Sequence, residues 1–174
     1  MKWISTITLL FFSCFALAEE ESKLAQGNER IYKDMYLVTE LPSGFEENYL
    51  KMNNREILNF DSQDKTWNIR FEFFNDPGNK IGLDFAINGL NKNAAADEKL
   101  TLVNHREMFL GDRPVYYFKY HYMSMPRIMT ISEYFVMEAE QGTYVVSFSA
   151  PRKSYDYSFV KAFLESTFFG KSQS

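Results

Sequence analysis

The two histidines of this sequence, His105 and His121, are side chains that could bind a metal ion or transfer a proton. Both fall in segments with strand character, on either side of a turn expected at residues 111–112. If that turn is the centre of a hairpin, His105 lies opposite Phe118 and His121 lies opposite Leu102. The two rings would then sit roughly 10 Å apart along the strands, at the usual rise per residue. A bulge or a shifted register would change this distance.

Two interpretations of the histidines remain open. Together with Glu133 or Glu138, the pair could bind a metal ion or move a proton. Alternatively, they are two ordinary histidines on the surface of a sheet, and this is the interpretation that we favour.

Other catalytic patterns are missing from the sequence. The single cysteine, Cys14, lies in the first eighteen residues. Gly78 and Gly82 stand apart, so they do not form a glycine-rich phosphate loop, and the sequence contains no Gly-x-Ser-x-Gly motif. We therefore predict that the protein is not an enzyme and uses no cofactor.

A loop at residues 123–127 is the first candidate contact surface, because methionine and tyrosine form adaptable interfaces. The residues predicted to contact a partner are Tyr122, Met123, Met125, Pro126 and Arg127. The alternative is that Met123 and Met129 fill the edge of a sheet and only Met125 is exposed.

A second candidate surface is one face of the strand predicted at residues 113–123, with Tyr117, Lys119 and His121. A helix over residues 80–93 is expected to cover this face.

Charge and composition narrow the class of partner. The chain of 174 residues has 19 basic and 23 acidic side chains, with a formal net charge of −4 and no basic stripe. Nucleic acid is therefore excluded as an expected partner, since phosphate binding needs clustered Lys and Arg. The 17 phenylalanines and 11 tyrosines bury much apolar surface and can take the place of disulfides, which stabilise many exported domains.

The first eighteen residues have the layout of a secretory signal peptide. Lys2 precedes an uncharged, apolar run, which ends in Ala16, Leu17 and Ala18 before three glutamates. The run is shorter than the ~20 residues of a membrane-spanning helix. We predict cleavage after about Ala18 and a periplasmic or secreted protein. The alternative is lipidation of Cys14, the only way in which we expect the protein to meet a membrane.

The rest of the chain reads as one domain over residues 35–170, with a flexible lead at 19–34 and a tail at 171–174. Alternation of apolar and polar residues predicts strands over 35–41, 56–60, 66–74, 100–110, 113–123, 127–137 and 143–149. Apolar residues spaced for a helix follow at 155–168. Residues 80–93 fit either a helix, which we favour, or a strand. The predicted fold class is α+β, a twisted antiparallel sheet covered by helices, with the last helix packed on the sheet.

Four short segments carry a resemblance to a known superfamily. They are Leu-Pro-Ser-Gly-Phe at 41–45, Gly-Asp-Arg-Pro-Val-Tyr-Tyr at 111–117, Gly-Thr-Tyr-Val-Val-Ser-Phe at 142–148 and Glu-Ser-Thr-Phe at 165–168. Together they resemble the superfamily that contains PsbP of photosystem II, the bacterial envelope protein DcrB and the Ran-binding Mog protein. The resemblance spans residues 36–169 and implies an α/β/α sandwich. The resemblance identifies no residue of this chain as a known binding residue of the superfamily.

Members of that superfamily are mostly non-catalytic and bind other proteins or assist assemblies. The resemblance thus implies an exported protein-binding or assembly-assisting module, with another envelope or secreted protein as partner. The alternative is a carrier of a small ligand or lipid, in a cavity that rings at 116–122 and 159–169 line between helix and sheet.

Overall fold

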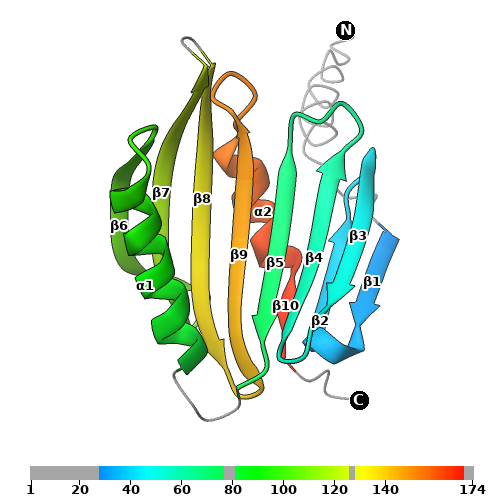
Figure 1. Ribbon diagram of the computed structural model, residues 1–174. Helices are drawn as coiled ribbons and strands as arrows, with labels where there is room; N and C mark the ends of the chain where they lie inside the picture. Colours follow the sequence, from blue (N-terminus) through cyan, green and yellow to red (C-terminus); the bar gives the residue numbers. More distant parts are fainter. Residues whose placement is uncertain (1–27, 77–80, 126–127, 171–174) are drawn as a thin grey trace, which may run out of the picture.

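The computed structural model describes residues 28–76, 81–125 and 128–170. Within them the chain forms two antiparallel sheets and two α-helices (Figure 1). Across the large sheet the strands are β3 (Phe45–Lys51), β4 (Arg55–Ser62), β5 (Asn68–Phe74), β9 (Gly142–Pro151), β8 (Ile128–Ala139), β7 (Arg113–Met125) and β6 (Leu100–Leu110). The small sheet contains β1 (Asn28–Tyr32), β2 (Leu37–Leu41) and β10 (Phe168–Phe169). The helices are α1 (Ile81–Ala96) and α2 (Tyr157–Ser166).

The large sheet lies between two cover layers. Helix α1 packs in front of β6, β7 and β8 in the view of Figure 1, and α2 with the small sheet packs behind. Two apolar cores result, one on each face of the sheet. The predicted class, an antiparallel sheet with helices on both faces, is confirmed.

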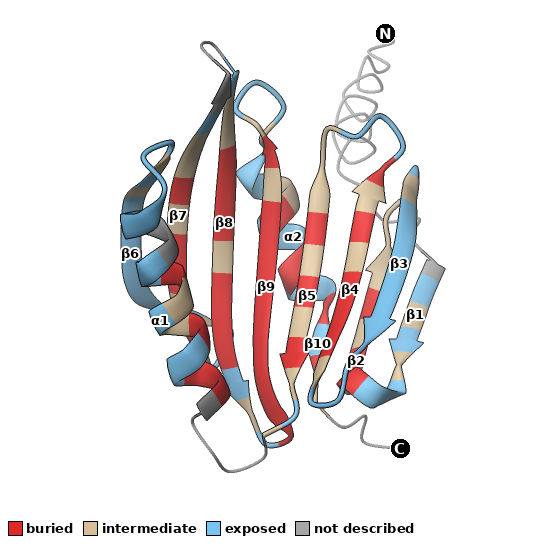
Figure 2. Ribbon diagram, viewed as in Figure 1, coloured by how far each residue is buried: buried red, intermediate tan, exposed pale blue. Residues whose placement is uncertain are grey.

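Alternation along β5 shows how the sequence assigns each face. Ile69, Phe71 and Phe73 are fully buried toward α2, while Arg70 and Glu72 between them are only partly buried. Figure 2 shows this banding along β4 and β5, whereas β8 and β9 are buried along most of their length. The half of the sheet made by β3, β4 and β5 therefore presents polar side chains on its front face, away from α2.

Helix α2 is the cover that the sequence predicts. Its N-cap, Asp156, accepts a hydrogen bond from the Ser158 amide at 2.8 Å, which satisfies one of the free N–H groups of the first turn. Val160, Phe163 and Leu164 are buried against the sheet. The helix ends two residues earlier than the apolar spacing indicates, because Phe168 leaves it and pairs with Val38 of β2.

Helix α1 resolves the ambiguity at residues 80–93 in favour of the helix. Leu83, Ala86 and Leu90 are buried at helical spacing, and the Tyr120 hydroxyl donates a hydrogen bond to the Leu90 carbonyl at 2.9 Å. The face that α1 covers contains Phe118 and Tyr120. The expectation that it would cover Tyr117, Lys119 and His121 is wrong, since those residues point to the opposite side of the sheet.

Two strands differ from the predicted pattern. Residues 28–32 form β1, although the sequence places them in a flexible lead at 19–34. Residues 45–51 form β3, which the sequence analysis does not foresee because Glu46, Glu47 and Asn48 give it no apolar alternation. Both are edge strands, so burial imposes little pattern on them.

Several predictions lie outside the described residues, among them the signal peptide at 1–18 and the tail at 171–174. In the described part, no helix combines the length and apolarity needed to cross a membrane.

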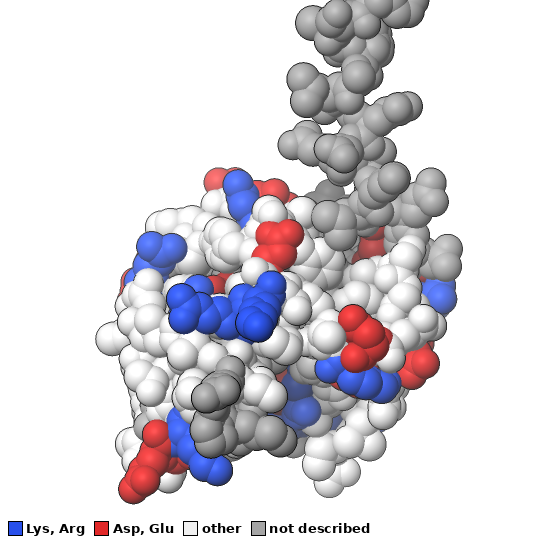
Figure 3. Space-filling model, turned by 90° about the horizontal axis from the view of Figure 1, so that it is seen from above, with Lys and Arg blue, Asp and Glu red and all other residues white. Residues whose placement is uncertain are grey.

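Basic side chains gather in the middle of the end face where β7 and β9 finish, with acidic side chains around them (Figure 3). His121 lies near this end. Burial, and then the charges of Lys119 and Arg152, lower its pKa. A neutral imidazole is therefore favoured at this position.

Candidate functional site

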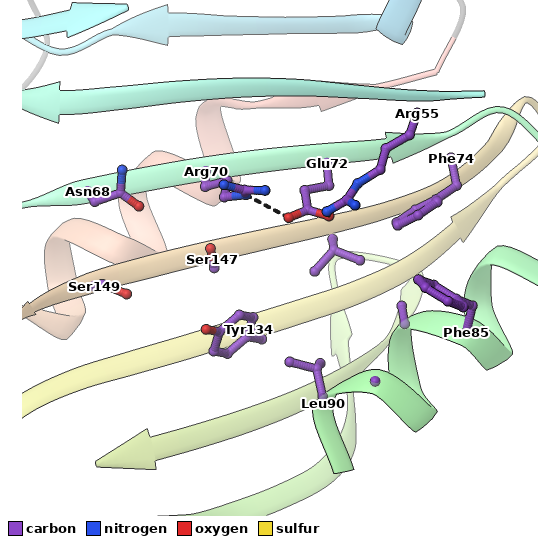
Figure 4. Close-up of a pocket in the computed structure, with 13 residues that line it drawn as sticks. Arg55, Asn68, Arg70, Glu72, Phe74, Phe85, Leu90, Tyr134, Ser147 and Ser149 are labelled. Atoms are coloured by element: carbon purple, nitrogen blue, oxygen red, sulfur yellow. Dashed lines mark hydrogen bonds and ion pairs between the residues drawn. The ribbon is translucent and has the colours of Figure 1, made fainter. Parts of the chain in front are cut away.

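A groove beside α1 is the first candidate site (Figure 4). It lies where the helix stops covering the front face of the large sheet, and it has a volume of about 360 Å³. Its residues come from β4, β5, β8, β9 and α1. They are Arg55, Asn68, Arg70, Glu72, Phe74, Phe85, Ala86, Gly89, Leu90, Tyr134, Val145, Ser147 and Ser149. We call this surface the α1 groove.

Two arginines share one carboxylate on the floor of the α1 groove. The Glu72 side chain accepts a hydrogen bond from Arg70 Nε at 2.6 Å and another from Arg55 Nη2. Arg55 also lies over the Phe74 ring, with its Cζ 5.4 Å from the ring centroid. The group of three has a net positive charge, and Arg55 Nε is buried without a hydrogen-bond partner. Each guanidinium gives only one of its three nitrogens to Glu72, so the other nitrogens at the surface of the groove can donate to an acceptor from outside.

An apolar rim borders these charges. Phe85 of α1 is 63% exposed and packs edge-on against Phe74, with ring centroids 5.9 Å apart. A second hollow of about 350 Å³ shares Arg55, Phe74 and Phe85 with the first and extends to Met52. Met52 is itself exposed. The α1 groove and this adjoining hollow therefore combine arginine, phenylalanine and methionine on one solvent-facing surface.

The opposite face of the sheet holds a buried charged cluster. The carboxylate of Glu133 on β8 is fully buried. Its Oε1 accepts hydrogen bonds from Tyr117 and Lys119, both at 2.8 Å. Burial, followed by the nearby Glu133 charge, raises the pKa of Tyr155. Neither the Tyr155 hydroxyl nor Glu133 Oε2 makes a hydrogen bond of good geometry.

This architecture is similar to that of solved structures. The chain is similar to cyanobacterial PsbP, CyanoP, from Synechocystis sp. PCC 6803. The TM-score is 0.56 at 12% sequence identity, over 82% of this chain and 91% of that one. The fold is PsbP-like. This confirms the predicted resemblance at the level of the fold.

The chain is also similar to a protein of known structure from Bacteroides thetaiotaomicron VPI-5482, with a TM-score of 0.60 and 16% identity. It covers 86% of this chain, which spans only half the length of the Bacteroides protein. No sequence profile of a known protein family matches the chain, and no curated protein sequence matches it. At these identities the likeness concerns the fold alone.

In this PsbP-like sheet the two histidines lie on opposite faces. His105 pairs with Phe118, as the sequence predicts, but His121 pairs with Thr101 instead of Leu102. A register shift between Leu102 and Asn104 causes the difference. The histidines consequently cannot act as a pair. Among the described residues, no group of three or more His, Cys, Asp or Glu side chains could hold a metal ion.

The hairpin predicted to contact a partner is described only in part. Met123 is 39% exposed and pairs with Met129 of β8, and Tyr122 is half-buried. Pro126 and Arg127 lie outside the described residues, and for Met125 only the backbone, in β7, is described. The role of this tip in contacting a partner stays a prediction.

Sequence reasoning missed the α1 groove. Its charged residues, Arg55, Arg70 and Glu72, lie on two strands, and Phe85 lies on a helix. The only signal was the polar side of the alternating segment at 66–74, which does not reveal what stands beside it. Arg55 reaches Glu72 because β4 and β5 place Arg55 opposite Phe74 and Ile57 opposite Glu72.

Proposed function

We propose that this protein is an exported, non-catalytic module that binds another envelope or secreted protein through the α1 groove. The observation that carries the proposal is the cluster of Arg55, Glu72 and Arg70 beside the exposed ring of Phe85. The PsbP-like fold supports a role as a binding scaffold, and the layout of residues 1–18 supports export.

The composition of the groove favours a protein partner. Arginine and aromatic residues dominate the binding energy of protein interfaces, and methionine is enriched there. A large apolar side chain of the partner would cover Phe85, and a carboxylate would accept hydrogen bonds from Arg55 and Arg70. We therefore expect a partner segment with an acidic residue close to an apolar one.

The test compares two exposed phenylalanines. Phe85 lies in the groove, whereas Phe109 is 70% exposed on β6, at the far edge of the sheet. Tagged wild-type protein, Phe85→Ser and Phe109→Ser would each be used to capture proteins from an envelope extract. We expect one protein to be recovered by the wild type and Phe109→Ser, with at least tenfold less recovered by Phe85→Ser.

Two results would contradict the proposal. One is equal recovery by Phe85→Ser and the wild type, and the other is recovery of no specific protein in repeated captures. A third variant, Met123→Ser, tests the hairpin tip separately, because Met123 is exposed near the end of β7 and does not line the α1 groove. Loss of capture by Met123→Ser alone would assign the contact to the tip and would overturn the role of the groove.

A further inference from the structure

A separate cavity of about 550 Å³ lies at the end of the molecule opposite the end where β7 and β9 finish. It forms where the turn between β6 and β7 meets the end of α2 and β10, on the α2 side of the large sheet. Leu110, Leu164, Phe168 and Phe169 supply its apolar wall. Its volume falls in the range of ordinary small-ligand sites.

The cation of this cavity is Arg113, at the start of β7. Its guanidinium is half-buried and lies over the Phe169 ring, with Cζ 5.4 Å from the centroid. Nη2 donates to the Phe169 carbonyl at 2.8 Å, and Nη1 lies 3.8 Å from the Met137 sulfur. Burial lowers the pKa of Arg113, which reflects the cost of holding this charge away from water.

No carboxylate of the described residues lies within 4.0 Å of Arg113 to form a salt bridge. Arg55 and Arg70, the comparable half-buried arginines, both pair with Glu72. Charged groups that proteins bury are ordinarily paired. Because Arg113 has no such partner among the described residues, its guanidinium can pair with an anion that enters the cavity.

Two acidic residues define the charge that the cavity accepts. Asp112 and Glu165 line it, and both are exposed, so they stand at its mouth. Both carboxylates repel an approaching anion, and they repel a dianion twice as strongly as a monoanion, so a ligand with one negative charge is favoured. The apolar wall then favours a ligand with a hydrocarbon portion.

We propose that this cavity binds an organic monocarboxylate with an apolar tail. The carboxylate occupies the free N–H groups of Arg113, in the planar geometry that guanidinium offers to carboxylates. The tail lies along Leu110, which is half-buried, and Phe168, which is 45% exposed without a ligand. This site is independent of the α1 groove, which lies on the other face of the sheet.

Octanoate is the probe, titrated into the full chain by calorimetry and by amide NMR. We expect saturable binding with shifts in the amides of residues 110–113 and 164–169. Octanol, which has the tail without the charge, should bind at least tenfold more weakly, and succinate should not bind. Equal affinity for octanoate and octanol would overturn the proposal.

Variants test the role of Arg113 directly. Arg113→Gln should weaken octanoate binding at least tenfold. Arg106→Gln is the matched control and should bind like the wild type, since Arg106 also lies over a ring, that of Tyr117, but outside this cavity. Wild-type affinity in Arg113→Gln would overturn the proposal.

Arg113→Gln also loses the hydrogen bond to the Phe169 carbonyl and could fail to fold. Phe168→Ala keeps Arg113 and removes only part of the wall, so it should bind octanoate several-fold more weakly while remaining folded. Unchanged affinity in Phe168→Ala would contradict the proposed path of the tail. Phe85→Ser should leave octanoate binding intact, which separates failure of this site from failure of the proposed function.

Discussion

Lys119 of β7 and Glu133 of β8 lie directly opposite each other and form a hydrogen-bonded ion pair, with Nζ 2.8 Å from Oε1. The carboxylate is fully buried, whereas about a quarter of the lysine side chain, 27%, stays exposed. Lys119 Nζ also stands over the Tyr155 ring at 5.7 Å. The pair therefore joins two strands of the sheet to the segment that leads into α2.

Replacing Glu133 by Gln should destabilise the protein by about 3 kcal/mol, because it leaves the partly buried ammonium of Lys119 without a counter-charge. This loss of stability lies at the lower end of the range that is usual for breaking a buried ion pair, since Lys119 retains contact with water. Urea denaturation followed by Trp67 fluorescence measures the change. Trp67 stacks on Tyr155, with centroids 5.2 Å apart, and so reports on the same region.

The control for that prediction is the exposed pair of Lys161 and Glu165, one turn apart on α2 with atoms 3.8 Å apart. Glu165→Gln should cost less than about 0.5 kcal/mol, as is usual for such helix pairs. If Glu133→Gln costs no more than Glu165→Gln, the buried pair does not stabilise the fold.

His121 should make stability depend on pH. Burial, and then Lys119 and Arg152, lower its pKa in the folded protein. As the pH falls below about 6.5, the unfolded chain binds a proton before the folded protein does. The free energy of unfolding therefore decreases from pH 7 toward pH 5, and His121→Asn should make this decrease smaller.

Chemical denaturation at a series of pH values measures this effect. Arg152→Gln offers a second check, because removing one nearby cation should move the pKa of His121 upward in an NMR titration. Lys153→Gln is the neighbouring control, since Lys153 is not among the charges that act on His121. An identical pH profile for His121→Asn and the wild type would contradict the prediction.

Alternation and ring content were enough to predict most of the fold. The segment at 66–74 alternates because one side of β5 enters the core, and α2 shows helical spacing because only one stripe of it is buried. The strand β3 shows no such alternation, because most of its side chains are exposed. The strand β10 could not be predicted either, since Phe168 and Phe169 continue the apolar spacing of α2 and nothing in this spacing shows that the chain leaves the helix there.

The site was harder to predict, because its residues meet only through register. The bulge after Leu102 carries no sequence signal, yet it shifts the partner of His121 by one residue. The α1 groove likewise depends on where α1 stops along the sheet, which is a matter of tertiary packing. Local patterns contain none of this information.

Gly142 begins β9 at a place where only glycine fits. Its φ of 153° is unfavourable for other residues, and an added Cβ would lie 2.1 Å from the Phe74 carbonyl oxygen. Gly142→Ala should therefore destabilise the protein by about 3 kcal/mol or more, measured by thermal denaturation.

Gly89→Ala is the matched control for this prediction. Gly89 lies within α1, and an added Cβ would meet nothing within 4 Å. Alanine should stabilise the helix there by roughly 0.5 to 1 kcal/mol. Equal effects of the two substitutions would show that the contact between Gly142 and Phe74 is not rigid.

The proposed export of the protein can be tested at residues 1–19, which lie outside the described part of the chain. Cleavage after Ala18 should give a native protein that begins at Glu19, as measured by intact mass and amino-terminal sequencing. Because Cys14 lies in the removed segment, Cys14→Ser should leave that mass unchanged. Ala18→Tyr should block processing, since the cleavage site requires small residues. A lipid attached to Cys14, or a native protein that retains Met1, would refute cleavage at this position.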